Sequence, residues 1–148
     1  MIRLALLALY LYIASKKGKG GKLLATLKGA ISSVFGPRVS PHTGQPSFHN
    51  GVDIAVPVGT PIIAPAAGTI KSIFTTATGG LQMIVTHDNG NESGYAHLSR
   101  VLFGPGVPVP AAKVIAESGA SGNVTGPHLH FTWKKDGEYL NPQDYFTF

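Results

Sequence analysis

Beyond residue 36, apolar and β-branched residues come in short runs separated by most of the chain's glycines and prolines, and Val52, Ile54 and Val56 alternate along one run. Such runs are typical of β-strands, and glycine and proline favour the turns between them. The pattern predicts an all-β core, an antiparallel sheet with a sandwich-like arrangement. The predicted strands are residues 51–56, 61–74, 81–87, 93–101, 114–117 and 128–133.

Residues 23–35 show a different period. Apolar residues recur there at intervals of three and four, the spacing of one face of an amphipathic helix. We therefore predict a short helix that lies on the surface of the domain or of a membrane. Its apolar face would be Leu23, Leu24, Leu27, Ile31, Val34 and Phe35.

The first 14 residues are apolar except for Arg3, and a segment rich in lysine and glycine follows them up to residue 22. A membrane-spanning helix needs about 20 apolar residues, but lysine side chains at its end can extend a shorter span. A signal peptide would carry its basic residues before the apolar run and a clearer cleavage pattern after it. We therefore expect residues 1–22 to be an uncleaved membrane anchor, with a signal peptide or a buried helix as alternatives.

The net charge of +5 is unevenly distributed. Residues 1–38 contain seven basic side chains and no acidic one, whereas the remainder contains five basic and seven acidic side chains. Basic residues beside an apolar segment are better explained by anionic lipid head groups than by nucleic-acid phosphates. We therefore expect a membrane partner and no nucleic-acid partner.

The chain has no cysteine, which excludes a thiolate metal site, a disulfide framework and a cysteine nucleophile. Two motifs offer nitrogen and oxygen ligands instead: residues 49–53 (His-Asn-Gly-Val-Asp) and 128–130 (His-Leu-His). In an extended strand, residues at even spacing point to one side, so each motif presents two such side chains together. Two imidazoles and one carboxylate from neighbouring strands would leave the fourth position of a zinc ion open for water, as in catalytic zinc sites.

Four segments in this order resemble the lysostaphin-type (LytM-like) zinc endopeptidases of peptidoglycan. They are residues 49–70, 94–99 (Gly-Tyr-Ala-His-Leu-Ser), 118–131 and 141–142. The resemblance spans roughly residues 36–145 and implies a zinc endopeptidase domain over residues 36–148. It implies that His49, Asp53 and His130 bind one Zn²⁺, and that His97 and His128 are catalytic residues without being ligands.

The family resemblance implies hydrolysis of peptide bonds in the stems or cross-bridges of peptidoglycan. The bond can be in a glycine bridge or between D-alanine and a diamino acid, and the sequence leaves both open. An imidazole titrates near pH 6.5, so His97 or His128 can take the water proton or stabilise the oxyanion, and these roles also stay open. Tyr95 either lines the substrate groove or packs across the sheet. We expect His87 to be structural and His42 to lie at the groove rim or in solvent.

Two other functions compete with this one. A catalytically inactive wall-binding or activator module would share the fold, but such relatives usually lose ligands that are all present here. A lipoyl or biotinyl carrier domain resembles residues 59–70, but its modified lysine at a tight hairpin is missing. We expect a membrane-anchored enzyme acting at the cell wall or periplasm. The basic residues after the leader would place the catalytic part on the cytoplasmic side of a cell membrane, where it could not reach the cell wall. An anchor in the membrane of a virus particle is therefore a second hypothesis.

Overall fold

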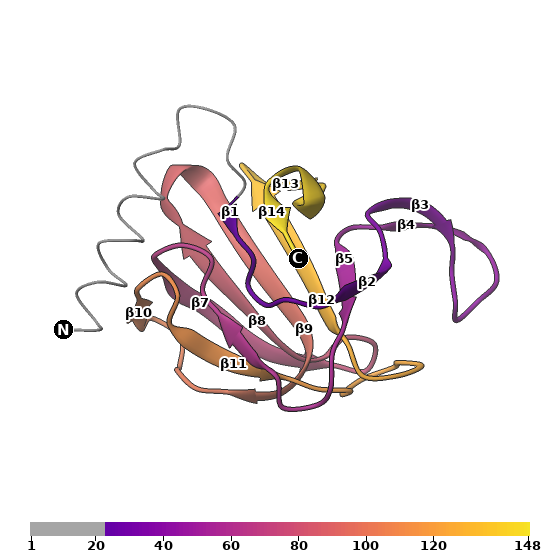
Figure 1. The fold of residues 1–148 in the computed structure, drawn as a ribbon, viewed down its shortest axis with the longest axis horizontal. Helices are drawn as coiled ribbons and strands as arrows, with labels where there is room; N and C mark the ends of the chain where they lie inside the picture. Colours follow the sequence, from indigo (N-terminus) through magenta and orange to yellow (C-terminus); the bar gives the residue numbers. More distant parts are fainter. Residues whose placement is uncertain (1–22) are drawn as a thin grey trace.

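The strand β9 (Asn91–Val101) is central to an antiparallel sheet in the computed structural model, which describes residues 23–148 (Figure 1). This ten-stranded sheet has the order β10-β7-β8-β9-β12-β5-β2, with β11 pairing β6 and β9 and with β13 pairing β12. Two small pairs complete the fold: β1 with β14, and β3 with β4. The other elements are β1 (Leu23–Leu24), β2 (Ala30–Ser33), β3 (Gly36–Val39), β4 (Pro46–His49), β5 (Val52–Ala55), β6 (Pro61–Ile63), β7 (Gly68–Thr76), β8 (Gly80–His87), η1 (Asp88–Gly90), β10 (Pro108–Val109), β11 (Val114–Ser118), β12 (Leu129–Lys135), β13 (Glu138–Leu140), η2 (Pro142–Asp144) and β14 (Phe146–Thr147).

The strand β9 changes partner along its length. Residues 91–96 pair with β12, whereas residues 98–101 pair with β11. At the junction His97 has a φ of 61°, and the register with β8 shifts by one residue at the same place. This β-bulge changes the direction of the side chain at position 97, as bulges near functional sites commonly do.

Alternation along the strands separates a core face from an outer face. On β12 the side chains of Leu129, Phe131 and Trp133 are buried, and His130 between them is half-buried on the opposite face. Buried residues of β6 and β11 belong to the same hydrophobic core as those of β7, β8 and β9. The all-β prediction is confirmed, and the sheet is mainly antiparallel.

The predicted helix at residues 23–35 is wrong. This segment contains β1 and β2, and β2 pairs with β5. Gly29 and the β-branched Ile31 disfavour a helix, and a Cβ at Gly29 would lie 2.8 Å from the side chains of Ile54 and Val56, so this backbone packs directly on β5. Since Leu27 lies in the core and β2 in the sheet, the fold begins before the predicted boundary at residue 36.

The other strand predictions hold with one exception. The single strand predicted over residues 61–74 is two strands, β6 and β7, which pair with different neighbours. Pro65 lies between them, and proline has no backbone N–H to donate to a continuous ladder. The predicted membrane anchor, residues 1–22, lies outside the described residues. Within residues 23–148, no helix is long and apolar enough to span a membrane.

Candidate metal centre

Asp53 and His130 are cross-strand partners. In the pairing of β5 with β12 they stand opposite one another, and both point to the outer face of the sheet because their strand neighbours fill the core. Asp53 Oδ1 lies 2.8 Å from His130 Nδ1. Register alone therefore brings together a carboxylate and an imidazole that are 77 residues apart in sequence.

His49 reaches the same point from a different strand. The sequence suggested that positions 49 and 53 share one extended strand, but β4 ends at His49 and β5 begins at Val52. The two residues between them, Asn50 and Gly51, make the connection. A Cβ at Gly51 would collide with the carbonyl oxygen of Phe131, so glycine is needed where this connection passes close to β12.

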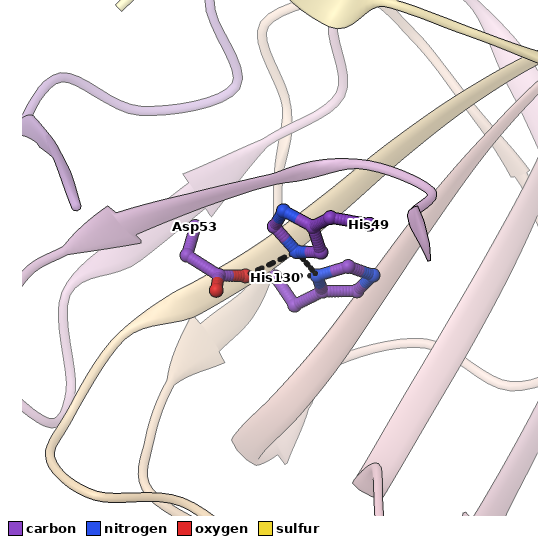
Figure 2. Close-up of side chains that lie close together, drawn as sticks. All are labelled: His49, Asp53 and His130. Atoms are coloured by element: carbon purple, nitrogen blue, oxygen red, sulfur yellow. Dashed lines mark hydrogen bonds and ion pairs between the residues drawn. The ribbon is translucent and has the colours of Figure 1, made fainter. Parts of the chain in front are cut away.

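The three side chains present one triangle of donor atoms (Figure 2). His49 Nε2 lies 3.1 Å from Asp53 Oδ1 and 3.0 Å from His130 Nδ1, and the third side is the 2.8 Å distance between Asp53 and His130. Zinc bonds of about 2.0–2.1 Å in tetrahedral geometry separate two ligand atoms by about 3.3 Å. The triangle is therefore close in size to one face of a zinc tetrahedron.

The outer nitrogens of the two imidazoles fix their tautomers. His49 Nδ1 lies 2.8 Å from the carbonyl oxygen of Val34, and His130 Nε2 lies 3.0 Å from the amide oxygen of Asn50. A neutral imidazole carries one ring proton, and these acceptors suit a proton on His49 Nδ1 and on His130 Nε2, which leaves His49 Nε2 and His130 Nδ1 with lone pairs for a metal. Partners of this kind typically orient metal-binding histidines.

Two lone pairs and a carboxylate that face one another repel unless a cation lies between them. Burial opposes ionisation of Asp53, but hydrogen bonds and charge from His130 and then His49 outweigh it and hold the pKa of Asp53 below its usual value. The donor set of two nitrogens and one oxygen, with no sulfur, fits Zn²⁺ in a site with an open fourth position.

His97 and His128 lie beside this triangle without joining it. Their ring centroids are 4.7 Å apart, and His128 Nε2 is 3.8 Å from Asp53 Oδ1. Each donates its Nδ1 proton to a backbone carbonyl, His97 to Ser121 at 2.8 Å and His128 to Gly126 at 2.9 Å. Both rings therefore keep Nε2 as a proton acceptor. Burial first, and then the nearby charges of His128 and His130, lower the pKa of His97.

All five residues line one open cleft of about 500 Å³. One wall is the β3–β4 hairpin, which projects from the sheet next to β5 (Figure 1). The opposite wall is formed by β7, β8 and the loop that precedes β12. Aromatic side chains stand on both walls, Phe48 on the hairpin and Phe74 on β7, and they are 60% and 39% exposed.

The remaining predicted residues lie in three different places. Tyr95 is 2% exposed, on the core face of β9, and its hydroxyl donates to Ser93 Oγ at 2.8 Å, so the structure supports the packing alternative. His87 bonds the Ala67 carbonyl and Ser93 Oγ and stacks near Trp133, as expected for a structural residue. His42 is exposed and lines the cleft, as expected for its rim.

Sequence reasoning missed three residues that contact the predicted site. Asn50 orients His130, the carbonyl of Ser121 orients His97, and Arg38 approaches Asp53 Oδ2 at 3.6 Å. The sequence placed Arg38 with the basic leader, because charge counting cannot distinguish a half-buried guanidinium beside a carboxylate from a lipid-facing one. A backbone carbonyl such as that of Ser121 gives no side-chain signal at all.

Comparisons with known proteins agree with this geometry. The chain is 38% identical over 114 residues to the peptidoglycan DD-endopeptidase ShyC of Vibrio cholerae, an alignment that covers 76% of this chain and 26% of ShyC. A zinc-containing peptidase from Vibrio cholerae superposes with a TM-score of 0.74 at 30% identity, over 82% of this chain and 38% of that one. The catalytic domain of lysostaphin from Staphylococcus simulans gives a TM-score of 0.69 at 29% identity, over 78% of this chain and 90% of the lysostaphin domain.

The alignments define the extent of the shared part. This chain spans about a quarter of the length of the curated relatives that it matches. The family model for Peptidase family M23 matches residues 47–142, which include His49, Asp53 and His130 and both neighbouring histidines. The chain belongs to Peptidase family M23.

Proposed function

We propose that this chain is a zinc-dependent endopeptidase that hydrolyses peptide bonds in peptidoglycan. The observation that carries the proposal is the convergence of His49 Nε2, Asp53 Oδ1 and His130 Nδ1 beside two imidazoles in one cleft. Membership of Peptidase family M23 and the likeness to a DD-endopeptidase and to zinc peptidases support it. A structural zinc site would be closed by a fourth protein ligand, whereas this one faces the cleft.

We infer that His49, Asp53 and His130 hold the ion. Zinc in such a site lowers the pKa of a coordinated water to about 7 and polarises a carbonyl oxygen. His97 and His128 supply the proton chemistry, since both line the cleft and each bonds a backbone carbonyl through Nδ1, which leaves Nε2 to accept a proton. One of them accepts the proton of the attacking water and returns it to the leaving amine, and the other donates a hydrogen bond to the developing oxyanion.

The cross-link between two D-residues is the bond that we propose as the substrate. Three relatives from Vibrio cholerae at 36–38% identity are named as peptidoglycan DD-endopeptidases, whereas lysostaphin is 29% identical. The open cleft suits an extended peptide better than a compact small molecule, because it has walls on two sides and no roof among the described residues.

The experiment is a digestion of purified sacculi by the full chain in detergent. Sacculi with direct D-alanine cross-links and sacculi with glycine bridges are each incubated with zinc-loaded protein, and the released peptides are identified by mass. We expect cross-linked dimers of the first type to fall and monomers to rise, with no release in the presence of a chelator. Release from glycine-bridged sacculi alone would contradict the proposed bond, and no release from either would contradict the activity.

Two alternatives lose support. An inactive wall-binding module has no need for five converging side chains with ordered tautomers, and here all five face one cleft. A carrier domain needs an exposed modifiable lysine at a hairpin, and no lysine lies in residues 59–70. Neither alternative explains why His97 and His128 line the same cleft and are both held through Nδ1 by backbone carbonyls.

For localisation we propose a membrane anchor in residues 1–22, with the enzyme acting at the cell wall or periplasm. The support is the apolar run and its basic flank in the sequence. Fractionation of cells that express the full chain or a version without residues 1–22 tests it: the full chain should sediment with membranes and the shortened one should not. Detection in purified virus particles would favour the viral membrane, and detection in uninfected cell envelopes alone would dismiss it.

A further inference from the structure

Arg38 connects the projecting hairpin to the main sheet at the metal centre. It lies on β3, which pairs only with β4 among the described residues. Its Nη1 donates to Ser33 Oγ on β2 at 2.6 Å and lies 3.6 Å from Asp53 Oδ2 on β5. One guanidinium group therefore contacts both strands that lie beside the hairpin.

The Arg38 guanidinium contacts two of the proposed metal ligands, one directly and the other through a serine hydroxyl. Asp53 turns Oδ1 toward the two imidazoles, and its second oxygen, Oδ2, faces Arg38. Ser33 Oγ, which accepts from Arg38, also lies 3.4 Å from His49 Nδ1, close to the bond that fixes the His49 tautomer. Arg38 thus contacts Asp53 directly and His49 through Ser33.

We propose that Arg38 is a positioning residue of the metal centre, which holds the Asp53 carboxylate with Oδ1 toward the ion and fastens the hairpin that carries His49. The inference rests on the proposed ligand set of His49, Asp53 and His130. A guanidinium suits this role because it is planar and permanently charged, and its Nη1 group both donates to the Ser33 hydroxyl and faces the Asp53 carboxylate, a geometry that a lysine ammonium does not reproduce.

If Arg38 acted only through its positive charge, it would weaken zinc binding instead of supporting it. A permanent cation this close to the site repels a divalent ion, so removing only the charge would make zinc bind more tightly. A role in fold stability explains the position poorly, because Arg38 Nε is buried without a hydrogen-bond partner among the described residues. Arg38 also lines the cleft, so a contact with a substrate carboxylate is the outcome that the experiment must separate.

The test measures zinc affinity by competition with a chelator, using the full chain in detergent. Arg38→Met removes the guanidinium and keeps most of the stem, Arg38→Lys keeps the charge, and Ser33→Ala removes the hydroxyl alone. Arg100→Met is the matched control, since Arg100 is 66% exposed and forms a 3.8 Å pair with Glu117. Unfolding of each variant in EDTA reports whether the apoprotein is intact.

Removal of a group that hydrogen-bonds to a metal-ligating side chain typically weakens metal binding by about 10–100-fold. We expect that range for Arg38→Met, a partial recovery at most for Arg38→Lys, a smaller loss for Ser33→Ala and no change for Arg100→Met. The apoproteins should unfold at similar temperatures, while the shift that zinc produces should be smaller in the Arg38 variants.

Three outcomes would overturn the proposal. Zinc affinity that is unchanged or tighter in Arg38→Met would exclude positioning. A higher KM with unchanged zinc affinity and kcat would assign Arg38 to substrate binding instead. Asp53→Ala serves as the reference: if it keeps its zinc, the ligand set itself fails, whereas loss of zinc in Asp53→Ala but not in Arg38→Met refutes only the role of Arg38.

Discussion

Asp53 and His130 face each other across β5 and β12, with 2.8 Å between the carboxylate oxygen and the ring nitrogen. The pair depends on register, because a shift of one residue in either strand would turn that strand's side chain, Asp53 or His130, into the core. His130→Ala should therefore leave the strands paired and abolish zinc binding, with loss of hydrolysis as a consequence. Elemental analysis after gel filtration measures the zinc content, and His42→Ala, at the cleft rim, is the control that should keep its metal. Zinc retained by His130→Ala would contradict the role of His130.

His97→Ala should keep zinc and lose activity. His97 lies beside the triangle, its ring centroid 6.4 Å from that of His130, and its Nδ1 is bonded to Ser121. Removing a general acid or base typically lowers turnover by about 10²–10⁴-fold. Zinc content and kcat on a cross-linked muropeptide, measured on the same preparation, separate the two effects. Normal turnover, or loss of the metal together with turnover, would contradict this assignment.

Gly51→Ala should destabilise the protein and weaken zinc binding. The added methyl would collide with the Phe131 carbonyl on β12, and backbone cannot move aside as a flexible side chain can. Overpacking of this kind costs about 1–3 kcal/mol of unfolding free energy. Urea unfolding in EDTA measures this cost.

Gly104→Ala is the matched control for that substitution. Gly104 is exposed, and a Cβ there would meet nothing within 4 Å. Its unfolding free energy should stay within about 0.5 kcal/mol of the wild type. Equal stability of both alanine variants would show that the close approach of residue 51 to β12 is unimportant.

His87 should make stability depend on pH. Burial is the main cause that lowers its pKa below 6.5, and it outweighs the carbonyl of Ala67 and the charge of Asp88. Below pH 6.5 the unfolded chain therefore binds a proton that the folded protein refuses, so the unfolding free energy falls as the pH drops from 6.5 through the lowered pKa. His87→Gln should show a smaller fall than the wild type between pH 7.5 and 5.

Unfolding is followed in EDTA in both proteins, so that the loss of metal at low pH does not contribute to the difference. The titration of the other histidines is common to both and cancels. Identical slopes in the wild type and His87→Gln would contradict the lowered pKa of His87.

Local sequence predicted the strands of the sheet well, because runs such as residues 81–87 carry their own β signal and their turns carry glycine. It failed at residues 23–35, where a helical spacing of leucines was overridden by the pairing of β2 with β5. That pairing depends on contacts between segments distant in sequence. The need for glycine at position 29, where the backbone packs closely on Ile54 and Val56, is evident only in the folded structure. The hairpin of β3 and β4 was also missed, since its exposed residues lack an apolar period.

The motifs predicted which side chains would be the proposed ligands, but neither motif alone showed how those side chains come together. His49 and Asp53 belong to two strands joined by a short turn, and the opposition of Asp53 to His130 is set by long-range register. Arg38 had no motif of its own. Its contact with Asp53 follows from where the hairpin lies, which no local pattern encodes.

Anomalous X-ray diffraction at the zinc edge, on crystals of the zinc-loaded protein, tests the central claim most directly. We expect one peak per chain, within about 2.0–2.2 Å of His49 Nε2, Asp53 Oδ1 and His130 Nδ1, with His97 and His128 outside the coordination sphere. A peak bonded to His97 or His128 in place of one of these three residues, or no peak in the cleft, would contradict it.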